Sequence, residues 1–428
     1  MQKIVLAIVL LVSLSVHGQK ALKVISPKET ERIERILAAD EMEGRKTFSP
    51  GIEKAASFIA NEFEKTGLNY LNNEKSHLQR FSMIKTTTTK QKILVNNKQI
   101  DQKHLLIISA KREIAVNEHS GYDKVVLAKE TNFINEVRKL LSSKNNTIIF
   151  ADTAQSAILK RLERVRSQLF TNQPDIIFIL TTETPSVFSI EATQEVTEMP
   201  LSNVVGVIPG RSKPDEYVIF SAHYDHLGIS TRNMENNDSI YNGANDDAAG
   251  TTAVIMLAKY FKKLNNNERT LVFAAFTAEE IGGFGSQYFS KQFDPASVVA
   301  MFNIEMIGTE SKWGKNSAYI TGFEKTDMGS ILQKNLENTG FTFHPDPYPD
   351  QQLFYRSDNA TLARLGVSAH TISTSKMDNE PNYHKASDEI NTLDLQNMTA
   401  IIKAIAISSR DIVSGKETPT RVDTSALK

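Results

Sequence analysis

From Asn203 onward, short β-rich runs alternate with stretches that have the composition and spacing of helices. The runs are VVGVIPG, YVIFSAH, TLVFAAF, VVAMFNIEMI, SAYITG and SAHTIST. Such alternation favours a largely parallel sheet covered by helices, because parallel strands are joined through helical crossovers. We therefore expect an α/β fold with a central mixed, mostly parallel sheet flanked by helices.

Three stretches space their apolar residues as on one face of a helix. The first runs from Ser49 to Leu68, with Pro50 near its start and Gly67 past the last apolar position. The second is AAGTTAVIMLAKYFKKL, and the third runs from about Thr392 to Val413. We expect amphipathic helices in all three.

The chain has 428 residues, more than one hydrophobic core usually supports, so two structural units are expected. Residues 83–200 mix short apolar runs with helical stretches and contain no cluster of histidines and carboxylates, so we interpret them as an inserted accessory domain. Residues 19–82 and 201–414 then form the two parts of the main domain. Residues 415–428 have the composition of a solvated tail.

The N-terminal sequence MQKIVLAIVLLVSLSVHGQK is typical of a cleaved signal peptide. One lysine precedes an apolar run from Ile4 to Val12, which falls short of the roughly 20 residues that a membrane-spanning helix needs. We expect residues 1–18 to be removed and the mature protein to lie outside the cytoplasm, in the periplasm or secreted, with no stable membrane insertion.

Charge and cysteine content exclude several classes of protein and site. The 49 basic and 50 acidic residues give a net charge of -1, so no global field favours nucleic acid as a partner. The chain has no cysteine, which excludes structural disulfides and thiolate metal ligands. Any metal must be bound by histidine, aspartate and glutamate.

Polar side chains directly follow the apolar runs, where α/β sheets gather their ligand sites. They are His223 to Asp225 after YVIFSA, Glu279 and Glu280 after LVFAAFTA, Glu305 after VVAMFNI, the turn Asn245 to Asp247 before a helix, and Tyr383 and His384 in the loop PNYHKASDE. Imidazole and carboxylate suit zinc, and a further carboxylate can act as a base. Each piece alone has a structural explanation, such as a helix N-cap for the Asn-Asp-Asp turn. Together they indicate a hydrolytic metal site.

The chain resembles the di-zinc exopeptidase family that includes bacterial leucyl aminopeptidases, glutamate carboxypeptidase II and, as a divergent branch, glutaminyl cyclases. The strings that carry the resemblance are LAADEMEGR, PGIEKAASFIANEFEKTGL, SAHYDHLG, YNGANDDAAGTTAVIMLA, FAAFTAEEIGGFGS, NIEMIG, YRSDN and NYHKASDEIN. They lie at both ends of the mature chain and skip the insert. The resemblance implies a zinc aminopeptidase-like fold, and an insert that corresponds to a protease-associated domain.

The resemblance also implies a set of metal ligands. His223 and Glu305 would hold one zinc ion, Glu280 and His384 would hold the other, and Asp246 would bridge the two. The family most often has aspartate at the position of Glu305, so the extra methylene is a departure. Asp247 remains an alternative to Asp246 as the bridging residue.

Three further roles follow from the resemblance. Glu279 would act as the general base toward a water shared by the two ions. Asp225 would orient His223, and Tyr383 would donate a hydrogen bond to the developing oxyanion. We expect His226 at the rim of the pocket and assign it no catalytic role. Arg356 to Asn359 match a family stretch near the substrate pocket, where a helix N-cap is an equal explanation.

The sequence thus predicts an exported zinc-dependent exopeptidase, most simply an aminopeptidase that acts on peptides with two zinc ions. A carboxypeptidase or dipeptidase on the same scaffold is one alternative, because the metals do not fix which terminus is recognised. A glutaminyl cyclase with a single zinc is another, although that branch usually has tryptophan where this chain has Tyr383. A binding protein that has lost catalysis is a third. The oligomeric state is not predicted.

Overall fold

The computed structural model describes residues 20–72, 74–128, 133–141, 143–232, 234 and 237–427. The expected signal peptide, residues 1–18, lies outside the described residues. Within these ranges, the helices are all too short or too polar to cross a lipid bilayer.

The chain divides into two compact units. Residues Phe81–Leu201 form one unit, here called the insert, and the residues before and after it form the other, here called the core unit. The predicted accessory domain, residues 83–200, lies within the insert. Its role as an accessory domain stays a prediction.

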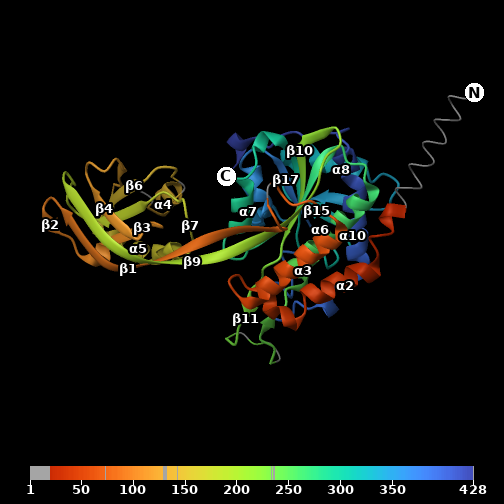
Figure 1. Ribbon diagram of the computed structural model, residues 1–428, viewed down its shortest axis with the longest axis horizontal. Coiled ribbons are helices and arrows are strands. Elements are labelled where there is room, and N and C mark those ends of the chain that lie inside the picture. Colours follow the sequence, from red (N-terminus) through yellow and green to blue (C-terminus); the bar gives the residue numbers. More distant parts are fainter. Residues whose placement is uncertain are drawn as a thin grey trace, which may run out of the picture. The chain divides into compact units, whose positions relative to one another are not determined.

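The sheet of the core unit has the strand order β16-β15-β17-β14-β10-β13-β9. Figure 1 labels β9, β10, β15 and β17 among these strands. The four central strands run parallel: β10 (Lys213–His223), β13 (Arg269–Phe276), β14 (Val298–Ile304) and β17 (Ser368–Ser373). The antiparallel pairs join β9 (Phe188–Ile208) to β13 and β15 (Ser317–Ile320) to β17, while β16 (Thr342–Pro345) is parallel to β15. The expected mixed, mostly parallel α/β sheet is confirmed.

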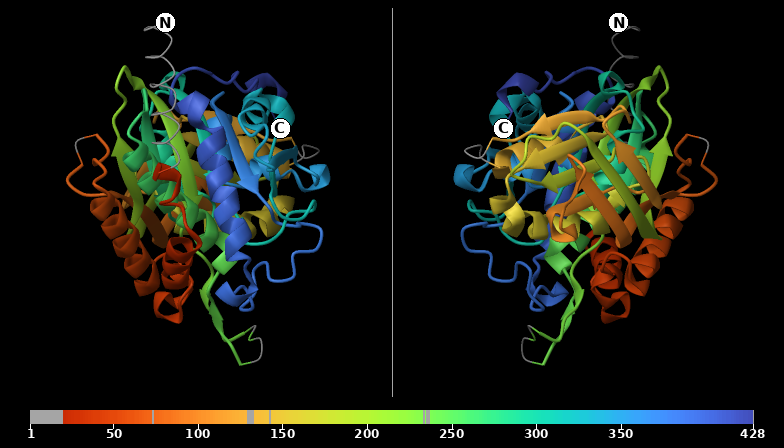
Figure 2. Two further views of the ribbon diagram at one scale, coloured as in Figure 1. Left: turned by 90° about the vertical axis from the view of Figure 1, so that its right-hand side faces the viewer. Right: turned by 90° about the vertical axis from the view of Figure 1, so that its left-hand side faces the viewer.

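Helices cover both faces of this sheet, because alternate side chains of each strand point to opposite faces. In β10, Phe220 packs in one cluster with residues of α2 (Pro27–Leu37), α3 (Pro50–Thr66), α6 (Ala249–Leu264) and α10 (Leu395–Ser408), whereas Ile219 packs in another with α7 (Phe284–Ser290) and α9 (Asn359–Ala363). Figure 2 shows the blue C-terminal helices lying over the strands. The sheet is therefore buried between two layers of helices.

The predicted helices form where their spacing and boundary residues require. Pro50 opens α3, and Gly67 closes it in a left-handed conformation with φ 74°. The predicted helix from 392 to 413 is divided: α10 ends at Ser408, and α11 (Arg410–Val413) follows. The core unit also contains α8 (Met328–Lys334) and the small hairpin of β11 (Gly228–Ile229) and β12 (Ile240–Tyr241).

The insert contains a four-stranded sheet in the order β3-β8-β6-β5. In chain order, the elements of the insert are β1 (Leu78–Val95), β2 (Lys98–Gln99), β3 (Leu105–Ile108), β4 (Glu113–Asn117), β5 (Asp123–Val126), α4 (Phe133–Leu141), β6 (Thr147–Ala151), α5 (Ser156–Leu162), β7 (Leu169–Phe170), β8 (Ile176–Leu180) and the first part of β9. The strands β3, β6 and β8 are completely buried. The insert thus has a hydrophobic core of its own.

The prediction of a solvated C-terminal tail was wrong for part of the segment. Most of its residues are exposed, but Val422 is buried and the guanidinium of Arg421 donates to the backbone oxygen of Val298 at 2.8 Å. The backbone N–H of Thr420 donates to the Asp327 carboxylate at 2.7 Å. The tail is therefore attached to the core unit.

Candidate metal centre

The candidate ligands lie at the carboxyl edge of the parallel strands. His223 is the last residue of β10, Glu305 directly follows β14, and Glu279 and Glu280 follow β13 after a turn of two residues. These strands are neighbours and run in the same direction, so their ends meet. Asp246 lies in the turn that leads into α6.

The two carboxylate oxygens of Asp246 face different imidazoles. Its Oδ1 lies 3.2 Å from Nε2 of His223, and its Oδ2 lies 3.3 Å from Nε2 of His384. Burial alone would raise the pKa of Asp246, but its contacts with the two histidines outweigh burial and lower that pKa. Asp246 is thus placed between two groups of potential ligands.

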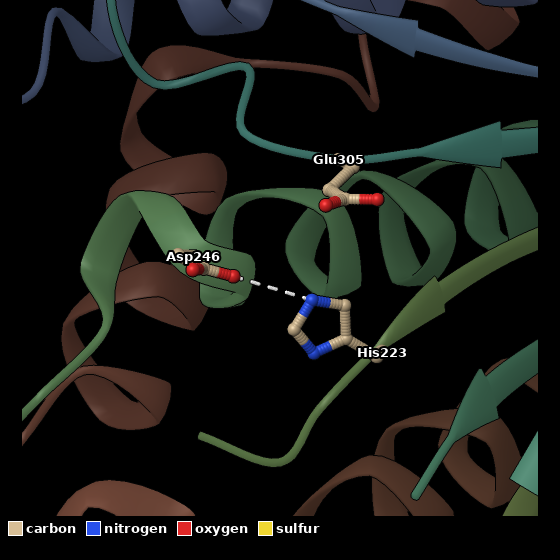
Figure 3. Close-up of side chains that lie close together, drawn as sticks. All are labelled: His223, Asp246 and Glu305. Carbon is tan, nitrogen blue, oxygen red and sulfur yellow. Dashed lines mark ion pairs between the residues drawn. The ribbon is translucent and has the colours of Figure 1, made fainter. Parts of the chain in front are cut away.

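The first group consists of His223, Asp246 and Glu305, whose ligand atoms all lie within 4.8 Å of one another (Figure 3). Burial raises the pKa of Glu305 to about 7. Nε2 of His223 and Oε2 of Glu305 are buried, and neither forms a hydrogen bond within the described residues. A buried nitrogen and a buried oxygen that both lack a hydrogen bond are suited to binding a cation between them.

The second group is built around Glu280. Its Oε2 lies 3.3 Å from Nε2 of His384, which is also 3.3 Å from Asp246. Two ligands of one tetrahedral zinc ion, each bonded at about 2.1 Å, are separated by roughly 3.4 Å. The donors and their spacing therefore suit zinc in this second group as well.

Asp225 acts mainly on the backbone of the neighbouring turn. Its carboxylate accepts the N–H groups of Glu279 and Glu280, at 2.9 and 3.3 Å, and the hydroxyl of Thr47 at 3.0 Å. Nδ1 of His223 instead faces the backbone oxygen of Asp225, at 3.1 Å, while the carboxylate lies 3.8 Å away. If Asp225 orients His223, as predicted, it does so through its backbone oxygen.

Asp247 has a different set of partners from Asp246. Its carboxylate accepts the backbone N–H groups of Gly250 and Met306, both at 3.0 Å. Of the two aspartates that the sequence left open, only Asp246 faces both His223 and His384. The geometry favours Asp246 as the bridging residue.

Glu279 and Tyr383 line a small cavity of about 60 Å³ next to these groups. Burial raises the pKa of Glu279 well above its usual value, and burial also raises the pKa of Tyr383. The ring of Tyr383 stacks on His384 with centroids 3.9 Å apart. Met306, Tyr319, Leu353 and Met377 contribute much of the apolar wall of the cavity, and Arg356 also lines it.

The sequence analysis assigned no role to three residues that lie near the centre. His226 is buried with its Nδ1 2.8 Å from Oε1 of Glu280. The Asp388 carboxylate accepts the N–H of Asp246, and the buried Arg45 donates to four backbone oxygens around the site. All three lie inside the strings that carried the family resemblance, which was the one available signal.

Comparison with known proteins identifies part of the chain. Residues 203–408 match the model of peptidase family M28. A probable zinc metalloprotease of Pyricularia oryzae is 34% identical over 113 residues, which cover 26% of this chain and 22% of that protein. A probable leucine aminopeptidase of Trichophyton verrucosum is 29% identical over 207 residues, 46% of this chain and 53% of that protein. The chain thus spans less than two thirds of the length of these curated relatives.

Solved structures share the fold at low sequence identity. An aminopeptidase from Aneurinibacillus sp. superposes with a TM-score of 0.54 at 15% identity, covering 96% of this chain and 98% of that one. A zinc aminopeptidase from Bacillus subtilis has a TM-score of 0.54 at 15% identity, covering 92% and 97%. This similarity establishes the fold.

Proposed function

The chain carries a peptidase family M28 domain, and we propose that it is an exported zinc-dependent exopeptidase that removes N-terminal residues from peptides. The observation that carries the proposal is the placement of Asp246, with one oxygen toward His223 and the other toward His384. Glu305 completes the first group of ligands and Glu280 the second. This arrangement fits two zinc ions that share one carboxylate.

When bound, zinc would polarise the scissile carbonyl and make water a stronger nucleophile at neutral pH. Glu279 lines the cavity, and its carboxylate would take the proton from the attacking water and deliver it to the leaving amine. The carboxylate of Asp225 accepts the backbone N–H of Glu279 at 2.9 Å and so holds this base in place. The hydroxyl of Tyr383 would donate to the oxyanion as it develops.

Aminopeptidase activity is the form of the proposal that the relatives support, since both the Trichophyton protein and the Aneurinibacillus structure are described as aminopeptidases. Met306, Leu353 and Met377 in the wall of the cavity would contact an uncharged side chain of the substrate. Free, N-blocked and C-blocked dipeptides, assayed with and without chelator, test this form. Hydrolysis of C-blocked but not N-blocked peptides is expected. The reverse preference would indicate a carboxypeptidase, and pyroglutamate formation with one zinc bound would indicate a cyclase.

The role of Glu279 is tested by Glu279→Gln, with Glu31→Gln on α2 as a control at an exposed position. Loss of the base should lower kcat by about 10²- to 10⁴-fold while the bound zinc, measured by elemental analysis, stays the same. Turnover near that of the unchanged protein would contradict the mechanism.

Export is the remaining part of the proposal, and the sequence of residues 1–18 supports it. Fractionation of cells that express the full chain should recover a shortened protein outside the cytoplasm. Removal of residues 2–18 should keep it inside. Retention of the full-length chain in the cytoplasm would contradict export.

A further inference from the structure

We infer that His226 is a positioning residue that donates a hydrogen bond to one oxygen of Glu280 and thereby reserves the other oxygen for a metal ion. The inference rests on the proposed metal centre, to which it adds a residue and a reason for how one ligand binds. His226 is 1% exposed, so its polar atoms must find partners inside the protein.

The two oxygens of Glu280 have separate partners. Oε1 lies 2.8 Å from Nδ1 of His226, and Oε2 lies 3.3 Å from Nε2 of His384. The distance to His226 is that of a strong, charge-assisted hydrogen bond, whereas the distance to His384 is that between two ligands of one ion. Of the two oxygens of Glu280, Oε2 is therefore the one that faces His384.

The surroundings of the His226 ring decide which nitrogen carries the proton. Nε2 is buried and forms no hydrogen bond within the described residues. A proton on Nε2 would be a buried donor without an acceptor, and it would leave Nδ1 with only a lone pair toward the Glu280 carboxylate. A proton on Nδ1 makes the 2.8 Å contact a hydrogen bond and leaves one unpaired acceptor, which costs less. With its proton on Nδ1, the ring is thus a donor to Glu280.

The same reasoning distinguishes a positioning residue from a metal ligand. His226, Asp246 and Glu280 are close enough to hold an ion by themselves. Coordination through Nδ1 would require the proton on Nε2, the state that leaves a buried donor unpaired. The 2.8 Å contact between Nδ1 and Oε1 of Glu280 thus supports a role for His226 that acts on the metal through Glu280.

The backbone fixes the ring in this position. A Cβ on Gly243 would lie 2.5 Å from Cδ2 of His226, so only glycine, with φ 53° at this position, lets the ring approach. The N–H of His226 donates to the backbone oxygen of Arg45 at 3.1 Å. With Oε1 occupied, Glu280 would bind through one oxygen, which leaves a coordination position for substrate or water.

The test compares His226→Asn with His226→Leu. The side-chain N–H of asparagine occupies nearly the place of the imidazole Nδ1–H, whereas leucine has no donor. Zinc is removed with chelator, and the binding of each ion is then measured by competition with a fluorescent zinc indicator. His226→Leu should lower the affinity for one of the two zinc ions by about 10- to 100-fold. The affinity of His226→Asn should stay within a few fold of that of the unchanged protein.

Three controls make the result decisive. His119→Leu, at a histidine with an 85% exposed side chain in the insert, should leave zinc binding unchanged. Thermal unfolding of the zinc-free variants shows whether each is folded, and the Co²⁺ absorption spectrum reports a change in the ligands or the geometry of the bound ion. An asparagine variant as weak as the leucine variant, with a changed Co²⁺ spectrum, would show direct ligation and overturn the inference. Unchanged affinity in the leucine variant would also overturn it.

These readouts are independent of turnover. If the protein binds zinc as described but hydrolyses no peptide, the proposed activity fails while the role of His226 stands. If zinc does not bind to the unchanged protein, both fail.

Discussion

The carboxylate of Asp388 accepts the backbone N–H of Asp246 at 3.0 Å, across 142 residues of sequence. It also accepts the N–H of Asn245 at 2.9 Å, and its backbone oxygen accepts the N–H of Ala244. Asp388 follows His384 by four residues, so the loop that brings one candidate ligand also fixes the turn that brings the other. The position of Asp246 between the two histidines depends on this connection.

We predict that Asp388→Ala weakens both folding and metal binding. Two buried N–H groups would lose their acceptor, at about 1–3 kcal/mol each, and Asp246 would be less well held. Zinc affinity should fall about 10- to 100-fold. Urea denaturation of the zinc-free protein and zinc titration measure the two effects. Asp388→Asn keeps one oxygen acceptor, so its stability and zinc affinity should lie between those of the alanine variant and the unchanged protein. An unchanged zinc affinity in the alanine variant would contradict the proposed link between Asp388 and the position of Asp246.

Glu305→Asp tests the departure from the usual family residue. Shortening the side chain by one methylene draws its carboxylate back from His223 and Asp246 by about 1.5 Å, a full C–C bond length. Because a zinc–oxygen bond tolerates only a few tenths of an ångström, we expect at least a 10-fold loss of affinity for the ion of the first group. Zinc titration measures it, with Glu310→Asp, at a partly exposed glutamate, as the control. Tighter binding in Glu305→Asp would show that the backbone here suits aspartate.

Arg45→Lys should destabilise the fold although it keeps the charge. The guanidinium is fully buried and donates to the backbone oxygens of Leu37, Tyr224, Asn242 and Gly243, at 2.5 to 2.8 Å. An ammonium group has three donors at one point and cannot reach four separate acceptors. We expect a loss of about 3–5 kcal/mol in the free energy of unfolding, measured with urea. Lys54→Arg, at an exposed position on α3, should change it by less than about 0.5 kcal/mol.

The sequence predicted those features that are set by neighbouring residues. The spacing from Ser49 to Leu68, with Pro50 and Gly67 at its ends, was enough to predict α3. The parallel strands brought Glu279 and Glu305 to one edge, as their positions after apolar runs required.

What the sequence could not predict depends on contacts between distant residues. Arg421 is 123 residues from the oxygen of Val298 that attaches the tail, and no local pattern marks either partner. His226 is likewise 54 residues from Glu280. The sequence placed His226 at the rim of the pocket, and only the folded chain shows which carboxylate it contacts.

His370 should make the stability of the fold depend on pH between about 4 and 6.5. It is 1% exposed, and burial lowers its pKa to about 4. The neutral ring is satisfied, because Nδ1–H donates to the oxygen of Thr321 and Nε2 accepts from the hydroxyl of Thr326, both at 2.8 Å. Protonation would add a buried charge and remove the acceptor.

The direction follows from proton binding. Between pH 6.5 and 4 the unfolded chain binds a proton at His370 and the folded chain does not, so the free energy of unfolding falls as the pH is lowered through this range. The contribution is complete above pH 6.5, and its loss by pH 4 is about 3 kcal/mol. His370→Asn keeps a donor toward Thr321 but does not titrate. Urea denaturation of both zinc-free proteins should therefore give a stability difference that shrinks from pH 7 to pH 4, whereas parallel curves would mean that His370 is protonated equally in both states.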